Sequence, residues 1–203
     1  MAAASESKTS THINVSPIVK NVNEENGIMK FTLSNTNVSF ANALRRVILS
    51  EIPCVVFRTA PYEKSMTTIH ANTTRLTNEI LKQRISCIPI YITDPTLDLN
   101  TLVVEINKQN KSDVIEYVTT EDIKIKDKTT DKYLPKRVVQ QYFPPNAQTG
   151  DYIIINRLRP KISETIPGEI IQLEAEMTRS TAKEDSCFNV TSTCSYSYTQ
   201  DRS

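Results

Sequence analysis

The residue types that carry acid–base catalysis are present in this chain, but they do not form a recognisable set. General acid–base catalysis needs a histidine or a carboxyl group beside the reacting atoms, and the only histidines are His12 and His70. A lone histidine such as His70 is more often a structural residue than a catalytic base. The adjacent acidic residues at 24–25, 121–122 and 184–185 are typical of surface charge. The sequence therefore predicts no catalytic residues.

Phosphate and metal chemistry also lack their usual sequence patterns. The 3 glycines, at positions 27, 150 and 168, cannot form a glycine-rich phosphate loop. No Asp-x-Asp-x-Asp cluster suits the two-metal chemistry of nucleotidyl transfer. The 4 cysteines include no C-x-x-C pair, and none lies between residues 88 and 186. This spacing excludes a locally built four-thiolate zinc or iron–sulfur site. We expect reduced thiols, no metal and no cofactor.

Two adjacent arginines, Arg45 and Arg46, are better candidates for recognition chemistry. A guanidinium group presents a planar fork of donors that can hold carboxylates or backbone carbonyls. Residues 39–57 position this pair, because they predict an amphipathic helix that stops at Pro53 and continues as a short apolar strand. Ser39 is the expected N-cap of the helix. The apolar stripe at helical spacing consists of Ala41, Leu44, Val47, Ile48 and Ile52.

On this pattern alone, an ordinary core helix with two solvated arginines is the commoner interpretation. The particular string of residues is more specific. Residues 40–46 read Phe-Ala-Asn-Ala-Leu-Arg-Arg, and residues 50–53 read Ser-Glu-Ile-Pro. This combination closely resembles the signature helix of the alpha-like subunits of multisubunit RNA polymerases. That family includes bacterial alpha, its archaeal counterpart and the third-largest subunit of eukaryotic RNA polymerase II.

A second block, residues 69–90, resembles the segment that follows the signature helix in the same family. The matching positions are Asn72, Thr74, Leu76, Glu79, Arg84, Ile88 and Pro89. We expect a short helix capped by Thr77, with Leu76 and Leu81 as a hydrophobic staple around the cap. The helix should end near Ile85, and residues 87–92 should return to extended structure. Two matched blocks in the family's order are harder to obtain by chance than one.

A third block, residues 170–198, matches the family only in part. Residues 182–184 and Phe188 keep the pattern of a family loop, whereas Ser180 stands where glycine is usual and Asp185 where histidine is usual. Some family members also carry a cysteine cluster that this chain lacks. These departures indicate a lineage distant from ordinary nuclear polymerases, such as a large DNA virus that encodes its own transcription machinery.

The expected fold is α+β and mainly β, an alpha-like dimerisation domain in part, with an inserted β-rich domain. Residues 1–11 are expected to be a disordered tail, residues 12–57 the first half of the dimerisation domain, and residues 58–200 the inserted domain. A first hairpin is expected from strands at 13–22 and 28–33 around a turn at 21–27. Further strands are expected at 102–106, 114–118, 123–125, 152–155 and 170–177. The family's return to the dimerisation domain after the insert is not found before residue 203, so we expect that half to be absent from this sequence.

The resemblance implies a non-catalytic assembly subunit of a DNA-directed RNA polymerase. Its helix would pair with a second, smaller alpha-like subunit, and this heterodimer would nucleate assembly of the largest and second-largest subunits, together with small polymerase subunits. The implied dimer contact consists of Phe40, Leu44, Val47 and Ile48. The implied large-subunit contact consists of Arg45, Arg46 and Glu51. DNA would be reached only indirectly through the complex. The protein would be intracellular, in the nucleus or, if viral, in the host cytoplasm or virion.

Composition is consistent with assembly and leaves two alternatives open. The formal net charge is +1, from 24 Lys plus Arg against 23 Asp plus Glu, which argues against binding nucleic acid through bulk charge. The hydrophobic share of 38% is somewhat low, as for a chain that completes its burial against partners. No apolar run approaches the roughly 20 residues that span a bilayer, so no membrane association is expected.

The first alternative is a stand-alone β-rich interaction module that is unrelated to transcription. The second is a small nucleic-acid-binding protein that uses a basic run within residues 124–137. The run consists of Lys124, Lys126, Lys128, Lys132, Lys136 and Arg137. A solvated hairpin face is the simpler interpretation of these charges.

Overall fold

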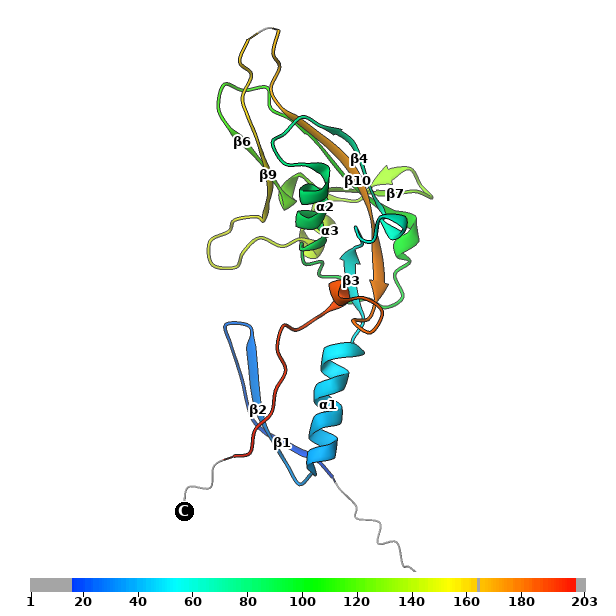
Figure 1. The fold of residues 1–203 in the computed structure, drawn as a ribbon, viewed down its shortest axis with the longest axis vertical. Helices are drawn as coiled ribbons and strands as arrows, with labels where there is room; N and C mark the ends of the chain where they lie inside the picture. The colour runs from blue at the N-terminus through cyan, green and yellow to red at the C-terminus, as the bar shows by residue number, and fades with distance from the viewer. Residues whose placement is uncertain (1–15, 164, 200–203) are drawn as a thin grey trace, which may run out of the picture. The chain divides into compact units, whose positions relative to one another are not determined.

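The computed structural model describes residues 16–163 and 165–199, which form two compact units (Figure 1). The first unit comprises residues 16–49 and 191–199, and the second comprises residues 50–190. The described residues are mainly β, with three α-helices. The expectation of a mixed, mainly β fold is therefore confirmed, whereas the predicted disordered tail lies outside the described residues.

The first unit begins with an antiparallel hairpin of β1 (Ile18–Glu25) and β2 (Ile28–Ser34). Asn26 and Gly27 form its two-residue turn with φ of 51° and 72°, the left-handed pair that a tight hairpin prefers. The predicted turn at 21–27 was wrong in extent. Asn21, with φ of 52°, lies in a register shift between Lys20 and Asn23. The turn-forming residues at 21–23 therefore bend a strand rather than end it.

Helix α1 (Val38–Ser50) follows, as predicted, but it ends at Ser50, so Ile52 of the predicted apolar stripe lies beyond the helix. The N-cap differs, because Oδ1 of Asn37 accepts a hydrogen bond from N of Phe40 at 2.8 Å. Ser39 lies inside the helix, so the predicted cap was wrong by two residues. Pro53 comes after the end of α1, and strand β3 (Cys54–Phe57) starts immediately beyond it, as predicted.

The second unit is built around one long strand, β10 (Ile170–Ser180), in an antiparallel sheet of order β3-β10-β5-β7-β8. The other strands of this sheet are β5 (Leu102–Gln109), β7 (Lys124–Asp127) and β8 (Lys132–Tyr133). Strand β4 (Thr67–Asn72) also pairs with β10. A separate two-stranded sheet joins β6 (Glu116–Thr119) to β9 (Ile154–Leu158).

The helices of this unit are α2 (Asn78–Ser86) and α3 (Lys136–Tyr142). Four short 3-10 helices complete it, at Tyr62–Lys64, Leu99–Thr101, Thr120–Asp122 and Ser186–Phe188. Helix α2 forms as predicted and Leu81 is buried, but Thr77, which occupies the N-cap position, makes no side-chain cap hydrogen bond. The pKa of Glu79 in its first turn is lowered by its own backbone N–H and then by the Thr77 hydroxyl.

The core of the second unit follows the alternation of the central strand. Ile171, Leu173, Ala175 and Met177 of β10 are buried at every second position, as expected for a strand with one face on a core. Leu81 and Ile85 of α2, Val104 and Ile106 of β5, and the stacked rings of Phe57 and Phe143 belong to the same cluster. Burying a side chain of this size stabilises a fold by about 1.5–3 kcal/mol.

Helix α3 was not predicted, because Pro135 at its N-cap and seven residues of weak pattern gave no helical signal. Residues 87–92, which were predicted to return to extended structure, pair with no strand; Ile88 is buried, and Ile90 and Ile92 pack on the core. Their backbone instead meets the end of α3, where N of Tyr91 donates to O of Tyr142 at 3.0 Å.

In the part of the chain that the structure describes, no helix is long and apolar enough to cross a membrane.

Candidate interaction surface

The apolar side chains of α1 are exposed or half-buried. No residue of this helix is buried, and the side chains of Phe40 and Val47 are 45% and 47% exposed. These two residues and Ala43 lie at i, i+3 and i+7, so they share one side of the helix. Leu44 and Ile48, one step around the helix, are half-buried. The four predicted dimer-contact residues therefore lie on adjacent sides of α1, with Phe40 and Val47 the more accessible.

The hairpin carries a second exposed apolar surface in the same unit. Val19 pairs with Leu33 across the strands, and Met29 and Phe31 follow on the same face of β2. The register shift after Lys20 adds one residue to β1. Because of this extra residue, Val22 lies on the same face of the hairpin as Val19. Val19, Val22 and Met29 are 55–60% exposed. This apolar face was not predicted from the sequence, because the alternation of apolar and polar residues along β1 is broken at Asn21.

Among the described residues of the first unit, none is buried. A 13-residue helix and a two-stranded hairpin are each marginally stable in water by themselves. Contiguous exposed apolar side chains on such elements are characteristic of surfaces that bind another protein. The second unit, in contrast, holds all of the buried hydrophobic residues in the described ranges.

Arg45 and Arg46 lie on different sides of α1. Successive residues of an α-helix are rotated by about 100°, so the two side chains leave the helix in different directions. Nε of Arg45 donates to Oδ1 of Asn42 at 3.1 Å, and its residue is half-buried. Arg46 is exposed. Of the pair, Arg46 is the more accessible to a carboxylate on a partner.

The third predicted contact residue, Glu51, lies just beyond α1 and meets the loop after β10. N of Lys183 donates to O of Ser50 at 3.2 Å, and Nζ of Lys183 lies 3.6 Å from Oε1 of Glu51. Two sequence blocks that resemble the polymerase family are thus brought together at this point. The contact gives Glu51 a local partner, while its residue remains exposed.

The same loop holds a buried arginine that the sequence analysis missed. Arg58 is 8% exposed, and its Nη1 donates to Oε1 of Glu184 at 2.6 Å. Asp185 lies 3.8 Å from Nη2, and the ring of Phe188 is 5.8 Å from Cζ. The exposed Glu184 and the half-buried Asp185 therefore compensate a buried cation, a role that their prediction as surface charge did not include. An arginine directly after an apolar strand was the available signal.

The second family-like block, residues 69–90, plays a structural role. Nδ2 of Asn72 donates to O of Leu76 at 2.8 Å, and its Oδ1 accepts from N of Thr74 at 3.1 Å. Arg84 ties α2 to β9 through hydrogen bonds of 2.7 Å to O of Ile154 and O of Ile155. Matching residues in this block thus position α2 within the second unit.

The remaining candidates for chemistry are dispersed. His70 lies 3.3 Å from Glu174 and both are exposed. Within residues 124–137, Lys126, Lys128 and Lys136 form ion pairs with acidic residues at 2.6–2.8 Å. Over the described ranges, no group of three or more His, Cys, Asp or Glu is placed to hold a metal ion.

These features define a mixed α+β protein with a well-packed β-rich unit and an exposed amphipathic helix. The sequence model of the RNA polymerase Rpb3/Rpb11 dimerisation domain matches residues 30–196. The chain belongs to this family, and the resemblance seen in its signature helix is confirmed.

Curated relatives agree with the family. The chain is 36% identical over 80 residues to DNA-directed RNA polymerase II subunit RPB3 of Schizosaccharomyces pombe, which covers 39% of this chain and 23% of the relative. It is 38% identical over 74 residues to DNA-directed RNA polymerases IV and V subunit 3B of Arabidopsis thaliana, covering 36% of this chain and 21% of the relative. A Dictyostelium discoideum RNA polymerase II subunit rpb3 is 31% identical over 84 residues, 41% of this chain and 26% of the relative. The aligned chain thus spans about a quarter or less of these relatives' length.

Proposed function

We propose that this chain is a non-catalytic assembly subunit of a DNA-directed RNA polymerase. It pairs with a second, smaller alpha-like subunit through α1, and the heterodimer nucleates assembly of the large catalytic subunits in transcription. Family membership supports this function, since the matching domain is a dimerisation domain by description. The observation that carries the proposal is that an amphipathic helix of 13 residues contains no buried residue.

The dimer contact is formed by Phe40 and Val47 at its centre, with Leu44 and Ile48 beside them. The exposed side chains of Phe40 and Val47 supply the apolar area that association buries. Ala43 between them is small and lets a partner helix approach closely. The exposed apolar face of the hairpin extends the surface that a partner covers.

The large-subunit contact is formed by Arg46 and Glu51, with Arg45 at its edge. Arg46 and Glu51 are both exposed, and an arginine fork beside a carboxylate can bind complementary charges on a partner. The second unit, residues 50–190, corresponds for the most part to the β-rich domain inserted in the family. Small polymerase subunits join this assembly, and DNA is reached only through the complex.

The relatives, as subunits of RNA polymerases II, IV and V, favour a nuclear site of action, and a viral origin would instead place the protein in host cytoplasm or virion. The lineage of the chain stays a prediction. Direct nucleic-acid binding by residues 124–137 is disfavoured, because acidic side chains pair with Lys126, Lys128 and Lys136. No observation favours the stand-alone module over an assembly subunit.

Affinity purification of the tagged chain from its own cell, or from the infected cell, tests the proposal. We expect a smaller alpha-like subunit and the two large polymerase subunits to co-purify, and to be identified by mass spectrometry. Replacing Phe40→Glu and Val47→Glu together should abolish capture of the smaller subunit, since two charges then face the apolar contact.

Val114→Glu with Ile162→Glu is the matched control, because these aliphatic side chains are 67% and 74% exposed in the second unit. This control should retain all polymerase subunits. Capture of no polymerase subunit by the unmodified chain would overturn the assignment, and salt-sensitive recovery of nucleic acid alone would favour the nucleic-acid-binding alternative.

A further inference from the structure

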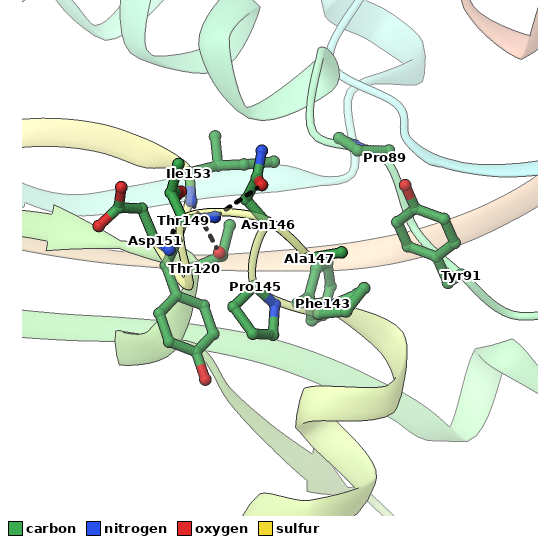
Figure 2. A pocket seen from close by; sticks show the side chains of 12 residues that line it. Pro89, Tyr91, Thr120, Phe143, Pro145, Asn146, Ala147, Thr149, Asp151 and Ile153 are labelled. Atoms are coloured by element: carbon green, nitrogen blue, oxygen red, sulfur yellow. Dashed lines mark hydrogen bonds between the residues drawn. The ribbon is translucent and has the colours of Figure 1, made fainter. Parts of the chain in front are cut away.

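The second unit contains an open hollow of about 590 Å³ that the assembly function does not use. We name it the proline–tyrosine hollow after six residues of its lining: Pro89, Tyr91, Phe143, Pro145, Asp151 and Tyr152. Its volume falls within the roughly 300–1,000 Å³ of typical ligand sites. Figure 2 shows Pro89 and Tyr91 on one side, Asp151 on the other, and Phe143 and Pro145 between them.

The walls of the hollow are fixed by local hydrogen bonds. Asn146 closes the loop that follows α3, because its N donates to O of Asp151 and its O accepts from N of Gly150, both at 2.8 Å. Its Oδ1 also accepts from N of Thr149 at 3.2 Å (Figure 2). On the other side, N of Tyr91 donates to O of Tyr142 at 3.0 Å. A surface held in this way loses little conformational entropy when a ligand binds.

One wall of the hollow presents an exposed aromatic ring, and a buried aromatic residue closes the floor. Phe143 is 2% exposed and stacks on Phe57 with ring centroids 6.1 Å apart, so the floor is anchored in the core. Tyr91 is 58% exposed. The hydroxyl oxygen of Tyr152 accepts from Nε2 of Gln140 at 3.0 Å, which leaves its own O–H to donate to a ligand carbonyl. Aromatic rings beside prolines form the kind of groove that holds an extended proline-rich segment.

The charge of the hollow selects among ligands. Asp151 is its one charged lining residue, and within the described residues no ion pair neutralises this carboxylate. A phosphate or nucleic-acid strand would meet an uncompensated negative charge here, whereas a basic side chain would be attracted.

We propose that the proline–tyrosine hollow binds an extended, proline-containing segment of a partner protein. The prolines of that segment lie against the exposed Tyr91 and Pro89, the Tyr152 hydroxyl donates to a backbone carbonyl, and an adjacent arginine or lysine reaches Asp151. A polyproline II segment suits this site because it is already extended and has unpaired carbonyls. The site lies outside α1, so it is independent of the proposed dimer contact.

Fluorescence anisotropy on the full 203-residue chain tests the proposal with four labelled eight-residue peptides. Two contain four prolines and one arginine, placed at the N-terminal end in one and the C-terminal end in the other. The third has glutamate in place of arginine, and the fourth has alanines in place of prolines. We expect one arginine peptide to bind at least tenfold more tightly than both the glutamate and the alanine peptides.

Variants of the chain locate the binding. Tyr91→Ala should weaken the better arginine peptide at least fivefold, and Asp151→Lys at least tenfold, while Asp151→Lys should improve the glutamate peptide. Tyr117→Ala and Asp113→Lys are matched controls with exposed side chains elsewhere in the same unit, and they should change affinity less than twofold.

Several results would overturn the proposal. These are no binding of either arginine peptide at 1 mM, equal affinity for all four peptides, or tighter binding of a labelled ten-nucleotide RNA that is lost in Tyr91→Ala. Circular dichroism of each variant confirms its folding, because Tyr91 and Asp151 are exposed and their replacement leaves the core intact. The α1 variants that lose polymerase capture should bind these peptides with unchanged affinity. Each proposal can therefore be contradicted without affecting the other.

Discussion

Nη1 of Arg58 lies 2.6 Å from Oε1 of Glu184, across 126 residues of sequence. The hydrogen bond joins the residue after β3 to the loop after β10, the two strands that pair at this edge of the sheet. Lys183, one residue earlier, bonds to the end of α1 at Ser50. The ion pair therefore holds the segment that leads from the proposed dimer helix into the β-rich unit.

Glu184→Gln should lower the unfolding midpoint in urea at pH 7, because a buried guanidinium loses its ionised partner. The pKa of Glu184 is lowered by the Ser180 hydroxyl and then by Arg58. The Glu184 carboxylate therefore stabilises the folded chain fully above a pH of about 4.3, the pKa of a glutamate in the unfolded chain. This stabilisation is lost as the pH falls through the lower pKa that Glu184 has in the folded chain.

The difference between wild type and Glu184→Gln should therefore be constant from about pH 7 to 5 and shrink on further acidification. Urea curves followed by circular dichroism at several pH values measure it. Glu63→Gln, at an exposed position, is the control and should match wild type within about 0.5 kcal/mol. A difference that grows toward acid pH would contradict the role given to the ion pair.

Two glycines of the second unit should respond very differently to alanine. A Cβ on Gly168 would lie 2.0 Å from the backbone oxygen of Asn110, and Asn110 is fixed because its Nδ2 donates to O of Val114 and O of Leu158. Gly168→Ala should destabilise the chain by at least about 2 kcal/mol through this overlap.

Gly150→Ala has a different, smaller cost. Nothing lies within 4 Å of its Cβ position, but its φ is +76°. The left-handed backbone then costs about 1–2 kcal/mol. Chemical denaturation of both variants measures the two free energies of unfolding. If Gly168→Ala lowers the free energy of unfolding by no more than Gly150→Ala does, the Asn110 backbone moves aside at little cost.

Thiol reactivity should separate the cysteines. Burial, followed by the nearby Asp185 carboxylate, raises the pKa of Cys187 to about 11, and burial also raises the pKa of Cys54. At pH 8 about one in a thousand Cys187 side chains is then a thiolate, against about one in four for an ordinary thiol. Cys87 is exposed, so a thiol reagent should modify it well before Cys187.

Mass spectrometry of partly modified chain locates the labelled residue. Cys87→Ser should remove the fastest phase and leave the rate at Cys187 unchanged. Raising the pH from 8 to 10 should speed modification of Cys187 by about a hundredfold, since its thiolate fraction rises tenfold per unit below its pKa. Modification of Cys187 as fast as Cys87 at pH 8 would contradict the burial of its thiol.

Strong local patterns in the sequence were sufficient for much of the fold. Helix α1 could be predicted because its apolar spacing, its arginines and Pro53 all agree, and β10 because it alternates over its buried face. Helix α3 could not be predicted from its seven residues. It packs on the core through Val139, and Phe143, just beyond its end, also packs in the core. Its stability comes from contacts distant in sequence, which local propensity does not reveal.

Long-range contacts limit the site prediction in the same way. Phe40 and Val47 were predicted as a contact surface, and the structure leaves them exposed. The Arg58–Glu184 pair was missed because its partners are 126 residues apart in sequence, although the position of Arg58 directly after an apolar strand was a signal for a buried cation. The hairpin face was missed because Asn21, with its positive φ, breaks the alternation that marks a strand.

Charge reversal at the two arginines of α1 should have unequal effects. Arg46 is exposed, whereas Arg45 is half-buried and its Nε is engaged by Asn42. If α1 presents Arg46 to a large polymerase subunit, Arg46→Glu should reduce recovery of that subunit at least tenfold. Arg45→Glu should reduce it less and destabilise the helix by about 0.2–0.5 kcal/mol through the lost side-chain pair.

Affinity purification with quantitative mass spectrometry measures both recoveries, and Arg137→Glu, at an exposed position of α3, is the control. Arginine and glutamate have similar helix propensities, so circular dichroism should show α1 intact in each variant. Full recovery of both large subunits with Arg46→Glu and Arg45→Glu combined would show that the arginines are not part of the proposed contact. The apolar contact through Phe40 and Val47 is tested separately, by the glutamate variants of those two residues.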